Sequence, residues 1–319
     1  MITSCFEMKA KMVYLCETAQ ICMDAVITYV DGSDPLWQQD YRTAVHGPVV
    51  ERRYRGWETL PFLLRGIERH MPFIDRVFLV VSRESQVPAW VDRDNLKVVL
   101  HREIIPAAFL PTFNSTTIEL FLHRIPGLSE RYLYFNDDIF PMFNCSEEDF
   151  FPGGRPATGF ARHYFAGNDF KKQTRRSYVL ARQALGLPKS HFFLRPQHTC
   201  TPMLRSCCES LFTRVAGQLL RSITPVRNAC NVNQYVFLDY ALLSGRGINR
   251  RIDNQHISLA AVSPGRLAKI IAEPKRKLLC INDVDMKPER CDAFGKALVE
   301  ALSKRFPDRS RFEKEVPAE

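Results

Sequence analysis

Arg131-Tyr132-Leu133-Tyr134-Phe135-Asn136-Asp137-Asp138 is an aromatic and apolar run that passes directly into two adjacent carboxylates. This composition predicts a buried β-strand, and the polar Asn-Asp-Asp end cannot continue it. The acidic pair is therefore expected where the strand leaves its sheet, which is where open α/β sheets bind ligands. Two neighbouring carboxylates repel each other unless a cation lies between them, so the simplest interpretation is a divalent-metal site that holds a phosphorylated substrate.

Strand and helix patterns alternate on both sides of this stretch. Further buried strands are predicted for residues 24–30, 77–81, 96–100 and 278–281. Apolar stripes at helical spacing predict helices that include residues 60–67, 118–125, 203–221, 234–244 and 292–305. This alternation predicts an α/β fold with a mostly parallel sheet flanked by helices.

The sequence divides into a short leading segment and one long domain. Residues 1–22 differ in character from the rest of the chain and are interpreted as an N-terminal extension or a misassigned start. Residues 23–319 are expected to form a single catalytic domain. Within it, glycines and prolines break the pattern over residues 150–196, where basic and aromatic side chains mix. This segment is predicted to be an insertion or a lid. It could bind an anionic acceptor, and an insertion without any role in ligand binding is given equal weight.

The excess of basic residues favours binding of an anionic partner but does not identify which one. The 319 residues carry 44 Lys and Arg against 35 Asp and Glu, a net charge of +9. Phosphorylated substrates, polyanions and acidic membrane faces all fit this balance, whereas no motif supports nucleic-acid binding. Ten cysteines without a regular framework suit reduced thiols, and no apolar segment is long enough to span a bilayer. A cytoplasmic location is therefore expected, either free or peripheral at the inner face of the cytoplasmic membrane.

Four blocks of residues carry a family resemblance. They are Asp24-Ala25-Val26-Ile27-Thr28-Tyr29-Val30-Asp31-Gly32-Ser33-Asp34-Pro35; a long block from Arg53-Tyr54-Arg55 through Leu110-Pro111-Thr112-Phe113-Asn114-Ser115 and Ile118-Glu119 to Asn136-Asp137-Asp138; His198-Thr199 with the later Arg227; and Cys280-Ile281-Asn282-Asp283. In their order and spacing they resemble the Stealth family. That family includes bacterial capsular polysaccharide phosphotransferases and the catalytic subunit of the lysosomal GlcNAc-1-phosphotransferase.

The resemblance implies a reaction. A hexosamine 1-phosphate would pass from a UDP-sugar, such as UDP-GlcNAc, to a hydroxyl of an acceptor glycan, with release of UMP, during synthesis of capsular or cell-surface polysaccharide. The partners implied are the UDP-sugar, a polysaccharide or oligosaccharide acceptor and other capsule-synthesis proteins at the membrane face. The fold implied is similar to a Rossmann-like α/β domain, with a basic and aromatic insertion and C-terminal helical additions.

Phosphoryl transfer depends mainly on positioning and on neutralisation of charge. Mg²⁺ (or Mn²⁺) is the expected ion, because it prefers carboxylate, phosphate and water oxygens. Asp137 and Asp138 are the predicted ligands, with Asn136 beside them. Glu119 is a third carboxylate that the resemblance places in the active site, where it would position water or accept a proton.

The remaining predicted site residues fall into two groups. Guanidinium groups suit the oxygens of phosphate, which makes Arg53, Arg55 and Arg227 candidates for holding the donor. The other predicted substrate-binding residues are the turn of the first block, expected on the uridine side, and the start of the last block: Tyr29, Asp31, Gly32, Asp34, Asn282 and Asp283.

The acceptor hydroxyl loses a proton during attack, so a general base is expected. His198 is the first candidate and Glu119 the second. The lysosomal-type relatives are expected to carry a histidine soon after the Asn-Asp of the last block, whereas this chain continues Asn282-Asp283-Val284-Asp285 without one. Either Asp283 or Asp285 takes that role, or the base is different.

Three alternatives to this function arise from the same residues. A metal-dependent glycosyltransferase would use the same acidic pair but release UDP. A metal-dependent phosphohydrolase is suggested by the Asp31-Gly32-Ser33-Asp34 turn, although the turn lacks that class's paired aspartates. A non-catalytic polyanion-binding protein is suggested by the net charge of +9.

Overall fold

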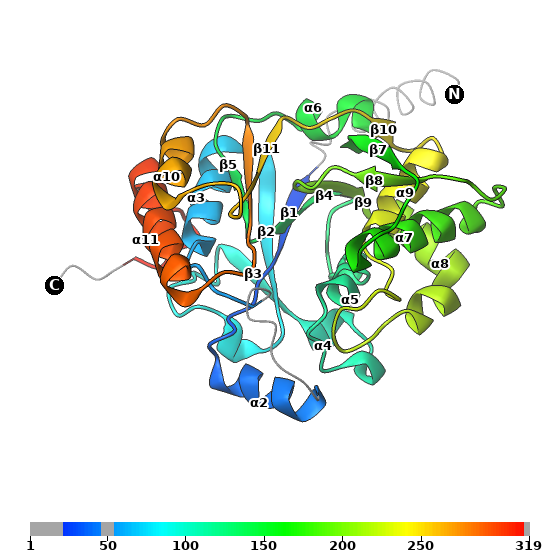
Figure 1. Ribbon diagram of the computed structural model, residues 1–319, viewed down its shortest axis with the longest axis horizontal. Helices are drawn as coiled ribbons and strands as arrows, with labels where there is room; N and C mark the ends of the chain where they lie inside the picture. Colours follow the sequence, from blue (N-terminus) through cyan, green and yellow to red (C-terminus); the bar gives the residue numbers. More distant parts are fainter. Residues whose placement is uncertain (1–21, 46–53, 316–319) are drawn as a thin grey trace, which may run out of the picture.

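A computed structural model describes residues 22–45 and 54–315 of the chain. Arg53 and nearly all of the predicted N-terminal extension lie outside the described residues. Figure 1 shows sheets in the middle of the molecule with helices on both sides. Within the described part, no helix is both long and apolar enough to cross a membrane.

The central sheet has five strands in the order β3-β2-β1-β4-β9. The first four, β1 (Met23–Thr28), β2 (Ile74–Val81), β3 (Leu96–Leu100) and β4 (Arg131–Asn136), run parallel to one another. The last, β9 (Thr201–Leu204), runs antiparallel to β4. The order 3-2-1-4 is that of a Rossmann-like sheet, and it reverses direction between β1 and β4. The predicted α/β class with a mostly parallel sheet is confirmed.

The two faces of this sheet are covered by different helices. Successive side chains of a strand point to opposite faces. Ile27 of β1 packs with α3 (Leu60–His70), α10 (Pro264–Ala272) and α11 (Pro288–Arg305). Val26 packs with residues of α8 (Arg205–Arg221) and α9 (Tyr235–Leu243). Figure 1 shows these two helical groups on opposite sides of the sheet.

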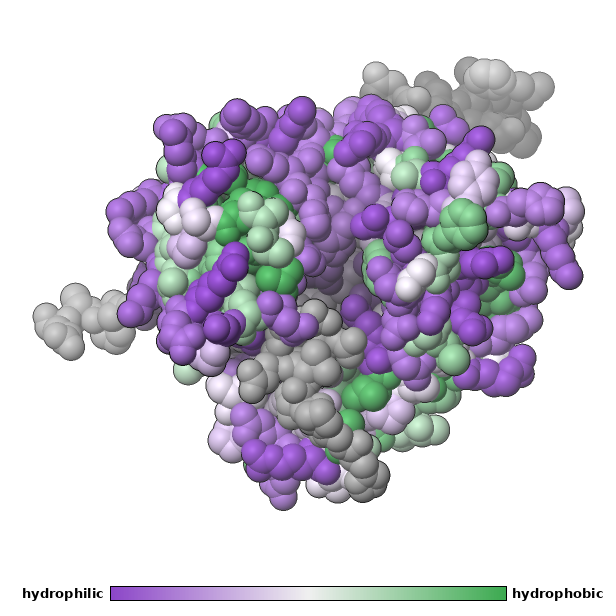
Figure 2. All heavy atoms as spheres, viewed as in Figure 1, coloured by the Kyte–Doolittle hydropathy of each residue, from purple (hydrophilic) through white to green (hydrophobic). Residues whose placement is uncertain are grey.

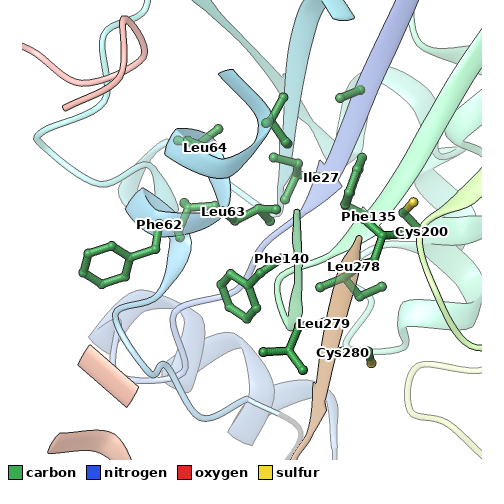
Figure 3. Close-up of a cluster of buried hydrophobic side chains, with 14 of the residues drawn as sticks. Ile27, Phe62, Leu63, Leu64, Phe135, Phe140, Cys200, Leu278, Leu279 and Cys280 are labelled. Atoms are coloured by element: carbon green, nitrogen blue, oxygen red, sulfur yellow. The ribbon is translucent and has the colours of Figure 1, made fainter. Parts of the chain in front are cut away.

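Helix α3 bears out its predicted apolar stripe. Leu60, Leu63, Leu64 and Ile67 are all buried. Figure 3 shows Leu63 of α3 gathered with Ile27 of β1 and Phe135 of β4. A Cβ atom on Gly66 would lie only 3.0 Å from the Pro141 carbonyl oxygen, so the glycine lets α3 lie close against the chain after β4.

A second sheet continues from the acidic pair. It consists of β11 (Asn254–Ser258), β12 (Leu278–Asn282) and β5 (Ile139–Pro141), in that order. β11 and β12 are parallel, and β5 is antiparallel to β12. Asp137 and Asp138 therefore connect the last residue of β4 to the first residue of β5. The predicted strand at 278–281 is confirmed, whereas β5 was not predicted because it has only three residues, and β11 was not predicted because its sequence Asn-Gln-His-Ile-Ser is mostly polar.

The segment over residues 150–196 contains more regular structure than its sequence pattern indicated. After α6 (Glu147–Phe150) and β6 (Ala157–Thr158), strands β7 (Phe160–His163) and β8 (Phe193–Pro196) form an antiparallel pair that encloses α7 (Asp169–Ala184). β6 pairs with β10 (Ile248–Asn249). Helix α7 is capped by Asn168, whose side chain accepts a hydrogen bond from Lys171 N, and it packs against α8 and α9. A lid function for this segment stays a prediction.

Shorter elements link the larger ones. Near the carboxyl edge lie α2 (Pro35–Ala44), α4 (His101–Ile104) and α5 (Ser115–Glu119), with 3₁₀ turns at Glu84–Gln86, Ala107–Phe109, Leu122–Arg124 and, elsewhere, Pro152–Gly154. The expected helix over 118–125 is wrong in extent, because hydrogen bonds between residues three apart replace the α-helical pattern from Thr117 onward.

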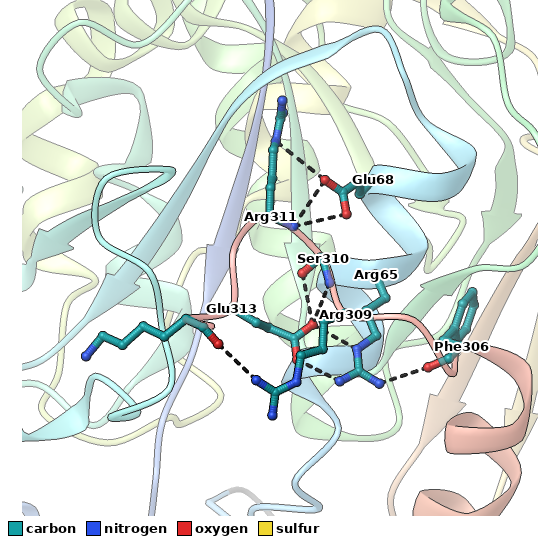
Figure 4. A network of polar contacts seen from close by, with 8 residues as sticks. Arg65, Glu68, Phe306, Arg309, Ser310, Arg311 and Glu313 are labelled. Atoms are coloured by element: carbon teal, nitrogen blue, oxygen red, sulfur yellow. Dashed lines mark hydrogen bonds and ion pairs between the residues drawn. The ribbon is translucent and has the colours of Figure 1, made fainter. Parts of the chain in front are cut away.

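The C-terminal segment is tied back to α3 by a polar network (Figure 4). Arg65 donates from Nε and Nη2 to the Glu313 carboxylate at 2.8 and 2.6 Å, and from Nη1 to the Phe306 carbonyl. Ser310 donates to the same carboxylate through its backbone N–H and its hydroxyl. The predicted helical addition is confirmed as α11, which begins at Pro288, where the fixed φ of proline suits a helix start.

Candidate active site

The acidic pair lies at the reversal point of the central sheet. Thr28, the last residue of β1, is the register partner of Asn136, the last residue of β4, so Tyr29 and Asp137 leave the sheet side by side. The Tyr134 hydroxyl hydrogen-bonds to Asn136 Oδ1 at 2.7 Å and to Thr28 Oγ1 at 3.0 Å. The two strand ends are therefore joined by side chains as well as by the backbone.

Negative charges converge at this point. Burial, followed by the charges of Asp138 and Asp283, raises the pKa of Asp137 to about 7. The Oδ1 atom of Asp138 is buried and has no hydrogen-bond partner among the described residues. A buried unpartnered carboxylate oxygen beside two other carboxylates is costly unless a cation binds there. The set supplies only carboxylate oxygens, which fits Mg²⁺ or Mn²⁺.

An ion pair between Asp283 and Arg55 joins the last of the four sequence blocks to the start of the second block. Arg55 Nη1 donates to both carboxylate oxygens of Asp283, at 2.8 and 3.1 Å. The guanidinium also lies 5.2 Å from the centre of the Trp57 ring. Burial raises the pKa of Asp283 in spite of Arg55. Asn282, beside it, donates from Nδ2 to the Asp283 carbonyl. The structure thus places Arg55, Asn282 and Asp283 together near Asp137.

Glu119 lies on a different wall of the site. Its helix, α5, is capped by Asn114, whose side chain accepts a hydrogen bond from Thr116 N. The Glu119 side chain is buried, and Oε2 accepts a hydrogen bond from Gln234 N at 3.3 Å. Burial raises its pKa even though the charge of Arg227 opposes the shift. Arg227 donates to Ser115 on the same short helix, so the two predicted catalytic residues Glu119 and Arg227 are neighbours.

His198 lies between these two walls. It precedes β9, and its Nε2 lies 3.9 Å from Asp138 Oδ2. Burial acts to lower the pKa of His198, but the hydrogen bond and charge of Asp138, with the charge of Glu119, raise it overall. Both predicted bases are therefore in the same site as the acidic pair.

The turn after β1 is held by its own hydrogen bonds. Gln86 binds the backbone of Asp31 through both its oxygen and its nitrogen, at 2.7 and 3.0 Å. A Cβ atom on Gly32 would lie 2.3 Å from the Tyr54 carbonyl oxygen, so only glycine fits there. Asp34 caps α2 by accepting from Leu36 N, and its other oxygen accepts from Ser85 and Gln86. Donor binding by these residues stays a prediction, and Asp34 has structural bonds at both oxygens.

Tyr29 differs from the rest of that turn because it faces the acidic pair. Burial, with the charges of Asp31 and Asp137, raises the pKa of Tyr29 to about 12. Its hydroxyl therefore keeps its proton near neutral pH and is available as a hydrogen-bond donor.

A cavity of about 540 Å³ opens at the carboxyl ends of β2 and β3, next to this turn. Its walls include Trp37, Phe113, Ser85, Thr112 and His101. Burial lowers the pKa of His101 to about 4, so its imidazole is neutral near pH 7. The lining also includes four charged side chains, Asp40, Arg83, Glu84 and Arg102, so the cavity combines aromatic walls suited to a planar ring with polar and charged groups. In the face shown by Figure 2, a mostly hydrophilic hollow separates the two halves of the molecule.

Several residues near the acidic pair were missed by sequence reasoning. His256 of β11 lies beside His198, with ring centroids 5.7 Å apart. Cys280 lies 3.8 Å from Asp138 Oδ2 through its Sγ. Tyr235 is buried at the start of α9, and the charge of Glu119 adds to burial in raising its pKa. Cys280 belongs to the last sequence block, which could have marked it as a site residue. Nothing in the sequence marked His256 or Tyr235 as site residues.

The chain is similar in sequence to known proteins over most of its length. The conserved region 2 of Stealth proteins, CR2, matches residues 53–157. The receptor polysaccharide phosphotransferase WefC of Streptococcus oralis is 30% identical over 337 residues, covering 91% of this chain and 99% of WefC. The capsular polysaccharide phosphotransferase WcwK of Streptococcus pneumoniae is 29% identical over 335 residues, with the same coverage of 91% and 99%.

Among solved structures, the galactosyltransferase LgtC in complex with donor and acceptor sugar analogues covers 91% of this chain and 98% of its own, at 12% identity and a TM-score of 0.39. That likeness is slight, and the fold class rests on the strand order. The identity and coverage shared with WefC, together with the matched conserved region, decide the family. The chain belongs to the Stealth family of polysaccharide phosphotransferases.

Proposed function

We propose that this protein transfers a hexosamine 1-phosphate from a UDP-sugar to a hydroxyl of an acceptor glycan, with release of UMP, in the synthesis of capsular or cell-surface polysaccharide. The observation that carries the proposal is the meeting of Asp137, Asp138 and Asp283 with Arg55 at the reversal point of the sheet. Carboxylates for a cation and a guanidinium for phosphate are what a bound pyrophosphate requires. Membership of a family of phosphotransferases supports the same reaction.

In this reaction, the acceptor oxygen forms a bond to the phosphorus that carries the sugar. The bond between that phosphorus and the oxygen bridging to the uridine phosphate breaks, and UMP leaves with the bridging oxygen. The proton of the acceptor hydroxyl passes to a base of the protein. The sugar keeps its own bond to phosphate, which separates this reaction from glycosyl transfer with release of UDP.

Asp137, Asp138 and Asp283 would hold Mg²⁺ or Mn²⁺. When bound, the ion neutralises charge on the pyrophosphate and on the departing UMP. The unpartnered Oδ1 of Asp138 and the raised pKa of Asp137 are the observations that support this assignment. Arg55 and Arg227 would bind phosphate oxygens from opposite walls, and the cavity of about 540 Å³ would receive the uridine.

Two side chains qualify as the base. His198 is next to Asp138, and Glu119 is buried with a raised pKa, which improves a carboxylate as a proton acceptor. Replacing each in turn, as His198→Gln and Glu119→Gln, separates them. The variant that lacks the base loses the rate of transfer while its KM for the UDP-sugar stays within about threefold.

The deciding experiment measures which nucleotide leaves. The full chain is incubated with Mg²⁺, a panel of UDP-sugars and a capsule oligosaccharide, and UMP and UDP are quantified with and without the acceptor. UMP that appears only with acceptor supports the proposal, most strongly with a UDP-N-acetylhexosamine. UDP would identify a glycosyltransferase, UMP without acceptor would identify a hydrolase, and no nucleotide from any donor would favour a binding protein. An Asp138→Asn preparation controls for contaminating enzymes, and Asp94→Asn, on an exposed turn, is the matched control substitution.

The proposal includes a place of action. We place the enzyme in the cytoplasm or peripherally at the inner face of the cytoplasmic membrane, in contact with other capsule-synthesis proteins. Ten cysteines, of which those described are free thiols, support a reducing compartment. Cell fractionation tests this: recovery in the soluble fraction, or release from membranes by high salt, is expected, and retention that only detergent reverses would contradict it.

A further inference from the structure

Three strong metal-ligand side chains meet at one edge of the acidic pair. They are His198, His256 and Cys280, and one ligand atom from each lies within 4.8 Å of those of the other two. None of them belongs to the oxygen-only set assigned to Mg²⁺. The three residues come from separate parts of the chain, namely the segment between β8 and β9, strand β11 and strand β12.

The backbone holds these side chains in place. His256 and Cys280 are register partners in the parallel pair β11–β12. The Asp138 carbonyl accepts from Ile281 N at 2.9 Å, which fixes Asp138 beside Cys280. Asn254, two residues before His256, donates from Nδ2 to the His198 carbonyl at 2.9 Å. The cluster is therefore built on sheet hydrogen bonds rather than on mobile side chains alone.

Asp138 supplies a fourth donor at suitable spacing. Its Oδ2 atom lies 3.9 Å from His198 Nε2 and 3.8 Å from Cys280 Sγ. In a tetrahedral zinc site with bonds of about 2.0–2.3 Å, two ligand atoms are about 3.3–3.8 Å apart. The separations around Asp138 are close to those values, and a small inward movement of the side chains completes the geometry.

The donor types select the ion. Two imidazole nitrogens, one thiolate and one carboxylate oxygen suit Zn²⁺, whereas Mg²⁺ prefers oxygen alone. Cys280 is buried and His256 is exposed, so an ion can enter from the side of His256. Binding of Cys280 as a thiolate releases its proton to solvent.

We propose that His198, His256, Cys280 and Asp138 form a binding site for Zn²⁺ or a similar thiophilic divalent cation, and that occupation of this site inhibits transfer. The inhibitory part rests on the proposed function, because it depends on His198 and Asp138 serving catalysis. Zn²⁺ would take the lone pair of His198 and draw Asp138 away from the Mg²⁺ set. The cell's supply of zinc would thereby act on polysaccharide synthesis through the active site itself.

The binding test does not need a substrate. The full chain is stripped with chelator and titrated with Zn²⁺ alone, and separately with Co²⁺, whose thiolate complexes absorb in the near ultraviolet. One ion per chain and a thiolate-to-cobalt band are expected. Cys280→Ser abolishes the band, and His256→Gln weakens Zn²⁺ binding by at least about 100-fold, since even an outer-shell partner is worth roughly 10–100-fold. Cys291→Ser, a cysteine on α11 outside the cluster, keeps both.

The inhibition test separates this inference from the proposed function. With Mg²⁺ saturating, Zn²⁺ lowers the rate of UMP release, and His256→Gln raises the half-inhibitory zinc concentration at least about tenfold relative to its own zinc-free rate. Absence of a cobalt–thiolate band, or equal zinc inhibition in the parent, Cys280→Ser and His256→Gln, overturns the site. If the band and its loss in Cys280→Ser are found but no donor releases UMP, the metal site stands and the proposed function fails.

Discussion

The aspartates at the two ends of the central sheet differ in whether the protein satisfies their charge. At the amino end, Asp24 of β1 is fully buried and accepts from Arg76 Nε and Nη2 at 3.0 and 2.9 Å and from Ser129 N at 2.7 Å. At the carboxyl end, Asp137 and Asp138 face Asp283, and Asp138 Oδ1 has no hydrogen-bond partner in residues 22–45 and 54–315. The same side chain thus completes the fold at one end and leaves charge for a ligand at the other.

Asp34 shows that position alone does not decide the role. It lies at the carboxyl edge, but its oxygens accept from Leu36 N, Ser85 and Gln86. Burial acts to raise the pKa of Asp34, but these hydrogen bonds lower it below its usual value. A satisfied carboxylate belongs to the fold even beside an active site, and an unsatisfied one is the candidate for chemistry.

The largest effect that sharpens this comparison is expected from Asp138→Asn. The substitution removes negative charge where a cation and the pyrophosphate would be held, so UMP release should fall about 10³-fold or more. Stability should change little, because the side-chain donors recorded at this carboxylate in the described part of the chain are distant, with His198 Nε2 at 3.9 Å and Cys280 Sγ at 3.8 Å. The rate of UMP release and a thermal melt in chelator measure the two effects. Activity within tenfold of the parent would contradict the metal assignment.

Asp24→Ala should produce the opposite pattern. It removes three hydrogen bonds and leaves the Arg76 guanidinium, which is 38% exposed, without its buried partner. A loss of about 2–3 kcal/mol in the free energy of unfolding is expected, measured by urea denaturation. The activity of the fraction that remains folded should equal that of the parent. A stability loss below about 0.5 kcal/mol would remove the distinction between the two ends.

The sequence predicted the strand that carries the acidic pair because its apolar run is long and ends abruptly. Asn136, Asp137, Asp138, Glu119 and His198 meet in one site, as the four blocks implied. The bonding of Asp34 was not predictable, because its partners Ser85 and Gln86 come after a different strand. Residue type and position indicate where a carboxylate is, whereas only the folded chain shows whether its charge is already satisfied.

Two strands of the second sheet could not be predicted from the sequence pattern. Strands β5 and β11 have three and five residues, and neither shows a clear apolar alternation. The closeness of His256 to Cys280 depends on the register of β11 with β12, which no local pattern encodes. Helix α7 was obscured for a different reason, since its basic face outweighs its buried face of mostly small and polar side chains, such as Thr174 and Ser177.

Arg65→Lys tests a second paired site with a smaller effect. A lysine keeps the positive charge but cannot bind both oxygens of Glu313 and the Phe306 carbonyl together, as Arg65 does in Figure 4. The expected loss is about 1–2 kcal/mol of unfolding free energy with unchanged UMP release. Lys304→Arg, on an exposed pair of α11 with Glu300, is the matched control and should stay within about 0.5 kcal/mol of the parent. Equal losses of unfolding free energy in both variants would show that the geometry of the Arg65 contact does not add to stability.

The smallest expected effect has the opposite sign. Asp137→Asn removes the carboxyl whose pKa is raised to about 7 by burial and by the charges of Asp138 and Asp283. In the metal-free protein at about pH 8, the ionised and half-buried Asp137 lies beside the negative charge of Asp138, so the substitution should raise the free energy of unfolding by about 1 kcal/mol. Mg²⁺ should stabilise the parent against thermal unfolding and the variant much less, because a ligand of the ion is lost. An Asp137→Asn protein that is less stable than the parent in chelator would mean that this carboxylate completes the fold as Asp24 does, and the contrast between the two ends of the sheet would then rest on Asp138 alone.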